Sequence, residues 1–238
     1  MLLASKSYAE GSLALCLYCS KLVDEVDNVD SQKLLSLLTP VAKTFPAEFG
    51  LLANDLAIQV HGGYGYTRDF DVEQLYRDNR LNPIHEGTSG IQSLDLLGRK
   101  IIGDSGESLK IFTKRVVKTC DQAIRTSLKS DANYLLEVIE NLERVCEILI
   151  NSKDSNTLAN SSAFLTGFGH IVVGWIWLDM AIVALSQKDE DHYGQPFLNG
   201  KIATMRYFFE CELPKADMLL NFVAKKSDVV SSVKTEFF

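Results

Sequence analysis

The sequence predicts an all-α protein, and three observations support that class. Apolar side chains recur three and four residues apart over most of the 238 residues, which is the spacing of a helix face packed on a core. No run alternates apolar and polar residues for long enough to indicate a half-buried strand. Capping residues, prolines and glycines stand where such helices would begin and end. The clearest apolar faces are Tyr8, Leu15, Tyr18 and Leu22; Phe49, Leu52, Ala53, Leu56, Ala57 and Val60; and Leu135, Val138, Ile139, Leu142, Cys146 and Leu149.

Local signals predict helix boundaries in the first half of the chain. Thr39-Pro40 has the pattern of an N-cap followed by a proline in the first turn. Pro46 falls inside the same apolar pattern, so we expect a kink or a break there. The run from Asp71 to Gln74 resembles a capping box at the start of a short helix. Thr88 is the expected cap of the helix that continues to Ile101.

Polar and glycine-containing segments divide the rest of the chain. Residues 103–107 (Gly-Asp-Ser-Gly-Glu) form a linker-like patch between two long helical regions, and residues 151–156 and 187–200 are further expected loops. We therefore expect two helical domains, residues 1–103 and 104–238. The uncharged stretch at 159–178 invites comparison with a membrane span, but its strongly apolar part is shorter than the ~20 residues that a span needs. We expect it to be a buried helix.

Composition narrows the function classes. With 46% hydrophobic and 23% charged residues the chain has the composition of a globular protein. The net charge of -7 argues against a sequence-independent hold on nucleic acid. Five cysteines without regular spacing indicate reduced thiols, and hence a cytoplasmic protein. Cys16 and Cys19 are expected to be core thiols and His170 a core histidine, so no metal site is predicted.

Two motifs contain residues suited to chemistry. The loop His61-Gly62-Gly63-Tyr64-Gly65 follows an amphipathic helix, so its glycines either end that helix or bring the backbone close to a ligand. Glu86 precedes Gly87, Thr88 and Ser89 at a helix start, where free amides favour a negative group. Such a carboxylate is either a proton acceptor or a complement to the helix dipole. The run from Arg77 to Arg80 is either a surface ion-pair cluster or a scaffold for the turn at Glu86.

Together, Gln59 to Tyr66 and Ile84 to Gln92 resemble the C-terminal signature of the flavin-dependent acyl-CoA dehydrogenases, and Arg77-Asp78 matches a pair that recurs in that family. The resemblance implies that Glu86 is the catalytic base and that Gly87 lies beside the substrate. It also implies two sets of FAD-contacting residues. The first set would contact the FAD of a neighbouring subunit and consists of Gln59, Val60, His61, Gly62 and Gly63. The second set lies at the start of the next helix and consists of Thr88, Ser89 and Gly90. The chain departs from many members at Gly90, where they have Gln, and at His85, where they have Tyr.

The resemblance extends over the remaining chain. Met1 to Gly11 resembles a helix of the family's C-terminal helical domain. Ile91 to Lys100 resembles the larger bacterial subgroup with an added C-terminal helical domain, which includes the methylmercaptopropionyl-CoA dehydrogenases. Phe168 to Val173 and Arg206 to Phe209 resemble that added domain. The family's N-terminal helical domain and central β-domain have no counterpart here. We therefore interpret the chain as the C-terminal portion of a longer enzyme: an expressed piece, a truncated gene or one subunit of a split enzyme.

The implied function is FAD-dependent α,β-dehydrogenation of an acyl-CoA thioester to a 2-enoyl-CoA, with electrons passing to an electron-transfer flavoprotein or similar acceptor. The alternative is a non-catalytic helical module that oligomerises, or a partner subunit that completes a flavin site on another chain. We expect a homo-oligomer, or a hetero-oligomer with a chain that supplies the missing domains. Alone, this chain is expected to bind flavin weakly or not at all and to be inactive.

Overall fold

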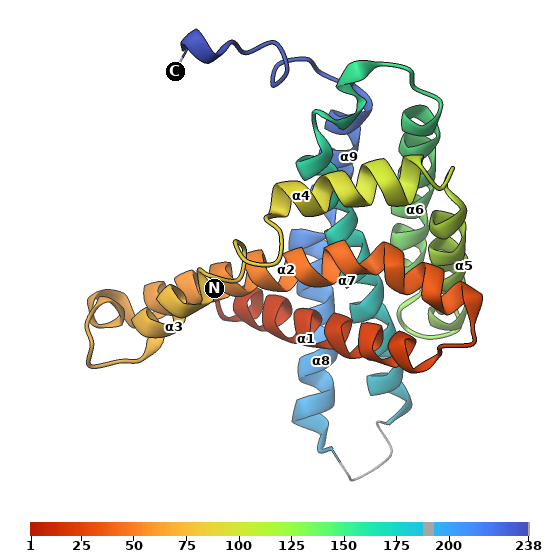
Figure 1. The fold of residues 1–238 in the computed structure, drawn as a ribbon. Helices are drawn as coiled ribbons and strands as arrows, with labels where there is room; N and C mark the ends of the chain where they lie inside the picture. The colour runs from red at the N-terminus through yellow and green to blue at the C-terminus, as the bar shows by residue number, and fades with distance from the viewer. Residues whose placement is uncertain (188–192, 238) are drawn as a thin grey trace.

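The computed structural model describes residues 1–187 and 193–237, and every regular element within them is a helix (Figure 1). The all-α prediction is confirmed. The α-helices are α1 (Leu2–Asp24), α2 (Val29–His61), α3 (Val72–Asn79), α4 (Ser89–Leu94), α5 (Glu107–Ala123), α6 (Lys129–Ile150), α7 (Ser161–Ser186), α8 (Gln195–Tyr207) and α9 (Pro214–Ala224). Short 3-10 and π segments are η1 (Gly62–Tyr66), η2 (Asp95–Ile102), η3 (Ser155–Leu158), η4 (Phe208–Glu212) and η5 (Thr235–Phe237).

Helix α7 is the centre of the hydrophobic core. It contacts α1, α2, α4, α5, α6, α8 and α9, and Figure 1 shows α1 and α2 lying across it. Within the described residues it is the helix long and apolar enough to cross a membrane, but 72% of its most apolar window is buried inside the protein. Each large apolar side chain removed from water here stabilises the fold by about 1.5–3 kcal/mol. The prediction of a buried helix is confirmed.

Two of the three predicted apolar faces are buried. The face on α6 is inaccessible along its whole length, and on α1 the side chains of Tyr8, Leu15 and Leu22 are buried. The face on the second half of α2 is not: Leu52 is 40% exposed and Val60 is 44% exposed. That expectation was wrong because helical periodicity shows which face is apolar, not whether another element covers it. Helices α3 and η1 pack on α2 but leave these two side chains partly open to solvent.

The predicted start of α2 was also wrong. The helix begins at Val29 after Asn28, whose side chain accepts a hydrogen bond from the Ser31 amide, and it runs through Pro40 and Pro46 without a break. Each interior proline removes one backbone hydrogen bond. That loss is offset by tertiary packing of five fully or nearly fully buried side chains in the same stretch. They are Leu34, Leu37, Leu38, Val41 and Phe45.

The remaining boundaries follow the sequence more closely. Helices α3 and α4 start directly after Asp71 and Thr88 as predicted, although neither side chain makes a capping hydrogen bond. A turn at 103–106 separates η2 from α5. The loop expected at 187–200 ends earlier, since α8 begins at Gln195, and its residues 188–192 lie outside the described part. One apolar core contains residues from both sides of position 103, so the division into domains there stays a prediction.

The cysteines are split between core and surface. Cys19, Cys120 and Cys146 are buried, Cys16 and Cys211 are exposed, and all five are free. The expected core position of Cys16 was wrong, because it lies on the outer face of α1 with Leu13 and Leu17, which are 61% and 62% exposed. Burial raises the pKa of the Cys19 thiol to about 12, which keeps that group protonated and unreactive.

Candidate active site

The two sequence motifs attach to different parts of α2. The glycine loop forms η1 at the C-terminal end of the helix, whereas the turn at Glu86 lies beside its middle, near Lys43 and Ala47 (Figure 1). From Ala47 to His61 the helix axis advances about 20 Å at 1.5 Å per residue. Within one chain, therefore, the motifs do not form a single pocket.

The backbone reverses sharply at Glu86 and Gly87. Glu86 has φ 55°, in the left-handed region that costs a non-glycine residue about 1 kcal/mol or more, and Gly87 has φ 93°. The Gln92 side chain donates a hydrogen bond of 3.2 Å to the Glu86 carbonyl oxygen and so closes the turn from the first turns of α4.

The Glu86 carboxylate is exposed at the edge of a depression of about 200 Å³. His85 lines the same depression, and its Nδ1 lies 3.2 Å from the carbonyl oxygen of Leu81. The apolar side chains nearest in sequence are exposed as well. They are Leu81 (59%), Ile84 (51%), Ile91 (60%) and Leu94 (48%).

Polar side chains of α2 hold the segment that leads to Glu86. Lys43 Nζ donates to the Asn82 carbonyl oxygen at 3.1 Å, and Asn79 Nδ2 donates to Asn54 Oδ1 at 2.8 Å. Asn82 Nδ2 in turn donates to Asn79 Oδ1 at 2.6 Å. At Gly50 a Cβ atom would come within 3.2 Å of Asn79 Nδ2, so a glycine allows this close approach. The contacts lie on one stripe of α2 with helical spacing: Lys43, Ala47, Gly50 and Asn54.

A second contact fixes the start of α4. The Ser89 hydroxyl donates a hydrogen bond to Oε1 of Glu48 on α2. Thr88 stands at the N-cap position but makes no side-chain capping hydrogen bond. The side-chain hydrogen bond at the start of α4 is therefore the one from Ser89 to Glu48 of α2. Arg77, by contrast, is largely exposed and forms an ion pair of 3.3 Å with Glu73, one helical turn earlier. For Arg77 the structure therefore shows a surface ion pair rather than a contact with the turn at Glu86.

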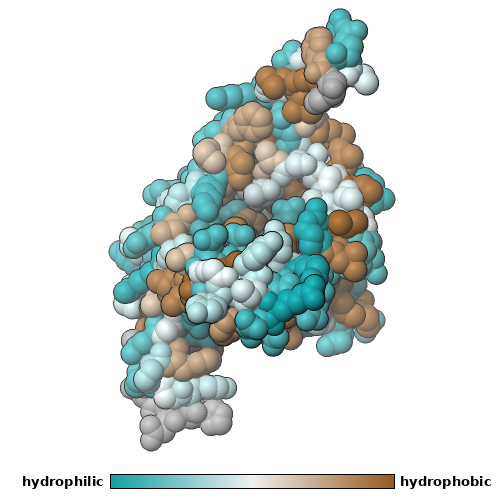
Figure 2. All heavy atoms as spheres, turned by 90° about the vertical axis from the view of Figure 1, so that its left-hand side faces the viewer, coloured by the Kyte–Doolittle hydropathy of each residue, from teal (hydrophilic) through white to brown (hydrophobic). Residues whose placement is uncertain are grey.

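The glycine loop is open to solvent except at Gly65, which is buried. Gly62 ends α2 with φ 61°, a conformation that favours glycine, and no atom lies within 4 Å of a Cβ built on Gly62 or Gly63. His61 Nδ1 lies 2.8 Å from the Ala57 carbonyl oxygen, and its ring contacts Phe70. Helix α3 buries no residue, and Figure 2, viewed onto this end of the molecule, shows hydrophilic side chains with apolar patches beside them. Gln59, Val60, His61, Gly62 and Gly63 are all exposed.

The structure thus distributes the predicted site residues over two surfaces. Glu86, Thr88 and Gly90 are exposed and Gly87 and Ser89 half-buried at the first surface. The second surface consists of Gln59, Val60, His61, Gly62 and Gly63. Sequence reasoning missed Lys43, Glu48 and Asn54. The signal for Lys43 and Asn54 was the stripe of small and polar residues that they share with Ala47 and Gly50, and Glu48 lies outside that stripe.

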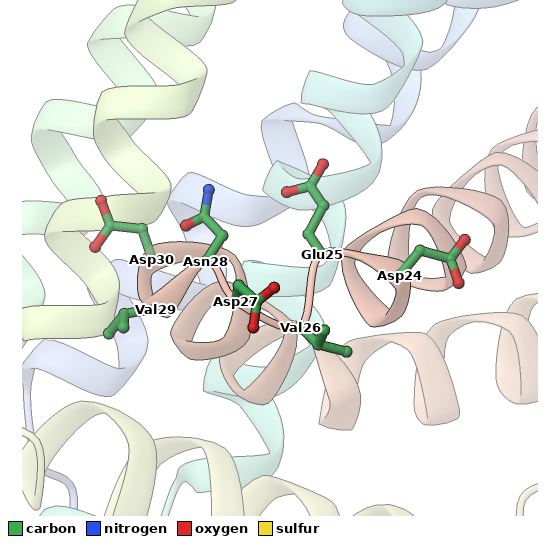
Figure 3. Close-up of a pocket in the computed structure, with 7 residues that line it drawn as sticks. All are labelled: Asp24, Glu25, Val26, Asp27, Asn28, Val29 and Asp30. Atoms are coloured by element: carbon green, nitrogen blue, oxygen red, sulfur yellow. The ribbon is translucent and has the colours of Figure 1, made fainter.

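Depressions larger than the one at Glu86 lie away from both surfaces. One of about 580 Å³ follows the turn between α1 and α2 and is lined by residues 24–30. Its carboxylates diverge: Figure 3 shows Asp24 and Asp30 at opposite ends of the turn, and Glu25 accepts a hydrogen bond from Ser31. Across residues 1–187 and 193–237, no three His, Cys, Asp or Glu side chains are grouped to hold a metal ion.

A buried polar cluster joins α1, α7 and η4. Glu212 is 2% exposed; its Oε2 lies 2.6 Å from Lys215 Nζ and 3.6 Å from His170 Nε2. Burial alone would raise the pKa of Glu212, but His170, Lys215 and Tyr8 outweigh it and lower that pKa. The core position of His170 is confirmed, although only Nδ1 is hydrogen-bonded, to the Thr166 carbonyl oxygen at 2.8 Å.

Comparison with known proteins places the chain in a family. Residues 4–101 match the family model "Acyl-CoA dehydrogenase, C-terminal domain", and residues 112–234 match "Acetyl-CoA dehydrogenase C-terminal like". The 3-methylmercaptopropionyl-CoA dehydrogenase of Ruegeria pomeroyi is 31% identical over 221 residues, which are 87% of this chain and 37% of that protein.

Two solved structures share the fold. The complex of Caenorhabditis elegans ACDH-11 with C11-CoA superposes with a TM-score of 0.74 at 21% identity, over 94% of this chain and 38% of that one. The acyl-CoA dehydrogenase of Bacillus anthracis complexed with FAD superposes with a TM-score of 0.62 at 18% identity, over 98% and 41%. This chain spans about two fifths of the length of each of these relatives. It belongs to the acyl-CoA dehydrogenase family, of which it represents the C-terminal helical region.

Proposed function

We propose that this chain supplies the catalytic base of an FAD-dependent acyl-CoA dehydrogenase. The observation that carries the proposal is the turn at Glu86: a carboxylate held in a left-handed backbone conformation, tied to α2 before and after, at the position that matches the family's base. The substrate is an acyl-CoA thioester and the product a 2-enoyl-CoA. Glu86 accepts the proton from the α-carbon of the acyl group.

Residues of both surfaces fit a flavin. Beyond Gly62 and Gly63 there is open space next to exposed backbone, and Gly90 leaves the start of α4 uncovered. Since about 20 Å of α2 separates the two surfaces, we infer that they serve two flavins, one of them bound mainly by a neighbouring subunit. Bound FAD supplies the acceptor for the hydride that leaves the β-carbon. The proposed partner that would accept the electrons from the flavin is an electron-transfer flavoprotein or a similar protein.

The walls that would exclude water from Glu86 are not supplied by this chain alone. A carboxylate becomes a stronger base when substrate and protein exclude water from it. Glu86 is exposed in this chain, so the excluding walls belong to the acyl group and to the protein that supplies the flavin domain. The exposed apolar residues beside the turn, such as Ile84 and Ile91, are suited to contact those walls.

The second candidate is a helical module that assembles with other copies and completes a site without its own catalysis. Exposed apolar side chains on the outer face of α1 and on the second half of α2 favour association. Both candidates predict an oligomer, either with identical chains or with a chain that carries the N-terminal and β-domains. They differ in whether Glu86 is needed for turnover.

The test compares this chain alone with the chain co-expressed with the polypeptide that supplies the N-terminal portion. We expect flavin absorbance only after co-expression, and bleaching of that flavin on addition of an acyl-CoA. Glu86→Gln should keep flavin and substrate binding but lower the bleaching rate by about a thousandfold, within the range for removal of a general base. Glu147→Gln is the control, since Glu147 is exposed on α6. Normal bleaching by the Glu86→Gln enzyme would exclude Glu86 as the base.

A further inference from the structure

We propose that Glu48 is a positioning residue for the catalytic turn: it holds the start of α4 against α2 and thereby fixes Glu86. The effect of Glu48 on catalysis rests on the function proposed above, whereas the hydrogen bond between Glu48 and Ser89 does not depend on it. Glu48 belongs to neither sequence motif, and it is 41 residues away from its partner Ser89 along the chain.

The contact is tertiary and shielded. Glu48 is half-buried on α2, where it borders a small cavity with Phe45 and Phe49 of the same helix and Leu165 of α7. Its Oε1 accepts the hydrogen bond from the Ser89 hydroxyl. A hydrogen bond to a charged acceptor in such surroundings is stronger than one between neutral groups. Its carboxylate also complements the partial positive charge at the start of α4.

The turn at Glu86 needs a stabilising contact with another element. A non-glycine residue in the left-handed region persists only where its surroundings impose that conformation. Glu86 is such a residue, and only Gly87 and Thr88 separate it from Ser89. Thr88 offers no side-chain cap of its own. Loss of the contact with Glu48 would therefore release the first turn of α4 and let the backbone at Glu86 relax.

The two ends of the turn are held by different side chains. Lys43 binds the carbonyl oxygen of Asn82 at the entry, and Glu48 binds Ser89 at the exit. The Lys43 contact is exposed, and an exposed pair contributes little. The half-buried Glu48 contact is the stronger hold. In this contact the Ser89 hydroxyl already donates its hydrogen bond to Glu48. The group of Ser89 that would remain free to donate to a flavin is therefore the backbone N–H.

Hydrogen–deuterium exchange on the 238-residue chain tests the contact without requiring activity. We expect Glu48→Ala and Ser89→Ala each to speed amide exchange at residues 86–92 by about tenfold or more, the effect of losing one charge-assisted hydrogen bond. The double variant should exchange no faster than either single one, because both remove the same contact. Glu48→Gln keeps an acceptor oxygen without the charge and should exchange more slowly than Glu48→Ala. Unchanged exchange in both single variants, or additive effects in the double variant, would overturn the proposal.

The co-expressed enzyme provides the functional arm. Glu48→Ala should lower the rate of flavin bleaching by acyl-CoA about tenfold with little change in the acyl-CoA concentration at half-saturation, and Glu48→Gln should restore it. A substitution that merely destabilised the fold would not be rescued in this way. If exchange responds but no variant, the original included, is bleached by acyl-CoA, the positioning contact stands and the proposed dehydrogenase function fails.

Discussion

At the scale of single residues, the turn at Glu86 depends on conformations that only certain side chains permit. Gly87 has φ 93°, and a Cβ there would lie 2.9 Å from Gln92 Nε2. The flexible Gln92 side chain can move aside, so the backbone conformation sets the cost of a substitution. Gly90, three residues later, is helical, and a Cβ there would make an ordinary van der Waals contact with Thr88 Oγ1 at 3.9 Å.

These two glycines should therefore respond in opposite directions to alanine. Gly87→Ala is expected to lower the free energy of unfolding by about 1 kcal/mol, since alanine is strained at positive φ. Gly90→Ala is the matched control and is expected to stabilise by up to about 1 kcal/mol, because alanine is the better helix former. Urea titration monitored by circular dichroism measures both. Equal changes in the two variants would contradict the assigned backbone conformations.

Residues of the site differ in how far the sequence could identify them. Glu86 stands in a local motif, so its place in a turn before a helix was predictable. The roles of Lys43, Glu48 and Asn54 depend on where the chain from Asn79 to Ser89 folds back along α2, and no local pattern encodes that return path. The exposure of Cys16 was missed for a related reason: composition favours a buried thiol, but only packing decides which face of α1 is covered.

At the scale of helices, close approach of α1 and α7 depends on a small residue at their crossing. A Cβ on Gly11 would lie 2.8 Å from both Trp177 Nε1 and Val173 Cγ1, and Trp177 also donates a hydrogen bond of 3.1 Å to the Ser7 carbonyl oxygen. These partners are buried and cannot move aside without repacking. Helix α8 offers the contrasting case in Gly200, which has open space at its Cβ position.

We expect Gly11→Ala to destabilise the protein by about 1–3 kcal/mol, the range for overpacking a core. Gly200→Ala, by contrast, is expected to be neutral or stabilising by up to about 1 kcal/mol, since nothing opposes the gain in helix propensity. Denaturant unfolding followed by the fluorescence of Trp175 and Trp177 measures both. A Gly11→Ala variant as stable as the original chain would show that the two helices are not in the close contact described.

Periodicity identified α1 and α6 as core helices because each buries the face that its apolar residues mark, whereas α7 was predicted from its uncharged apolar stretch. The sequence-based predictions for α2 were wrong at two points, and each has a physical reason. The capping pattern at Pro40 predicted the first turn of a helix there. In the structure α2 continues through Pro40, because the buried side chains around Leu37 and Val41 stabilise it by packing. The apolar face near Leu52 is marked correctly but is not covered within the described residues.

At the scale of the whole molecule, residues matched by the two family models share one core and one buried polar cluster. Tyr8 of α1 meets Glu212 of η4, which also contacts His170 of α7 and Lys215 of α9. Burial, together with the Glu212 charge, raises the pKa of Tyr8, so the phenol stays protonated in the folded protein. The cluster therefore links the two regions through one buried carboxylate.

The same cluster predicts how stability depends on pH. The folded-state pKa of Glu212 is lowered, so its contribution is fully present above the unfolded pKa of about 4.3 and is lost as the pH falls through the folded pKa. Glu212→Gln should cost about 3 kcal/mol at pH 7, the lower end for a broken buried pair, because the Lys215 side chain is 45% exposed. It should also flatten the loss of stability between pH 5 and about pH 3, where only the original chain has this carboxylate to protonate. Urea unfolding across that range measures the difference, with exposed Glu147→Gln as control. Parallel pH profiles for the original chain and the Glu212→Gln variant would show that the carboxylate at the junction of the two regions is not ionised in the folded state.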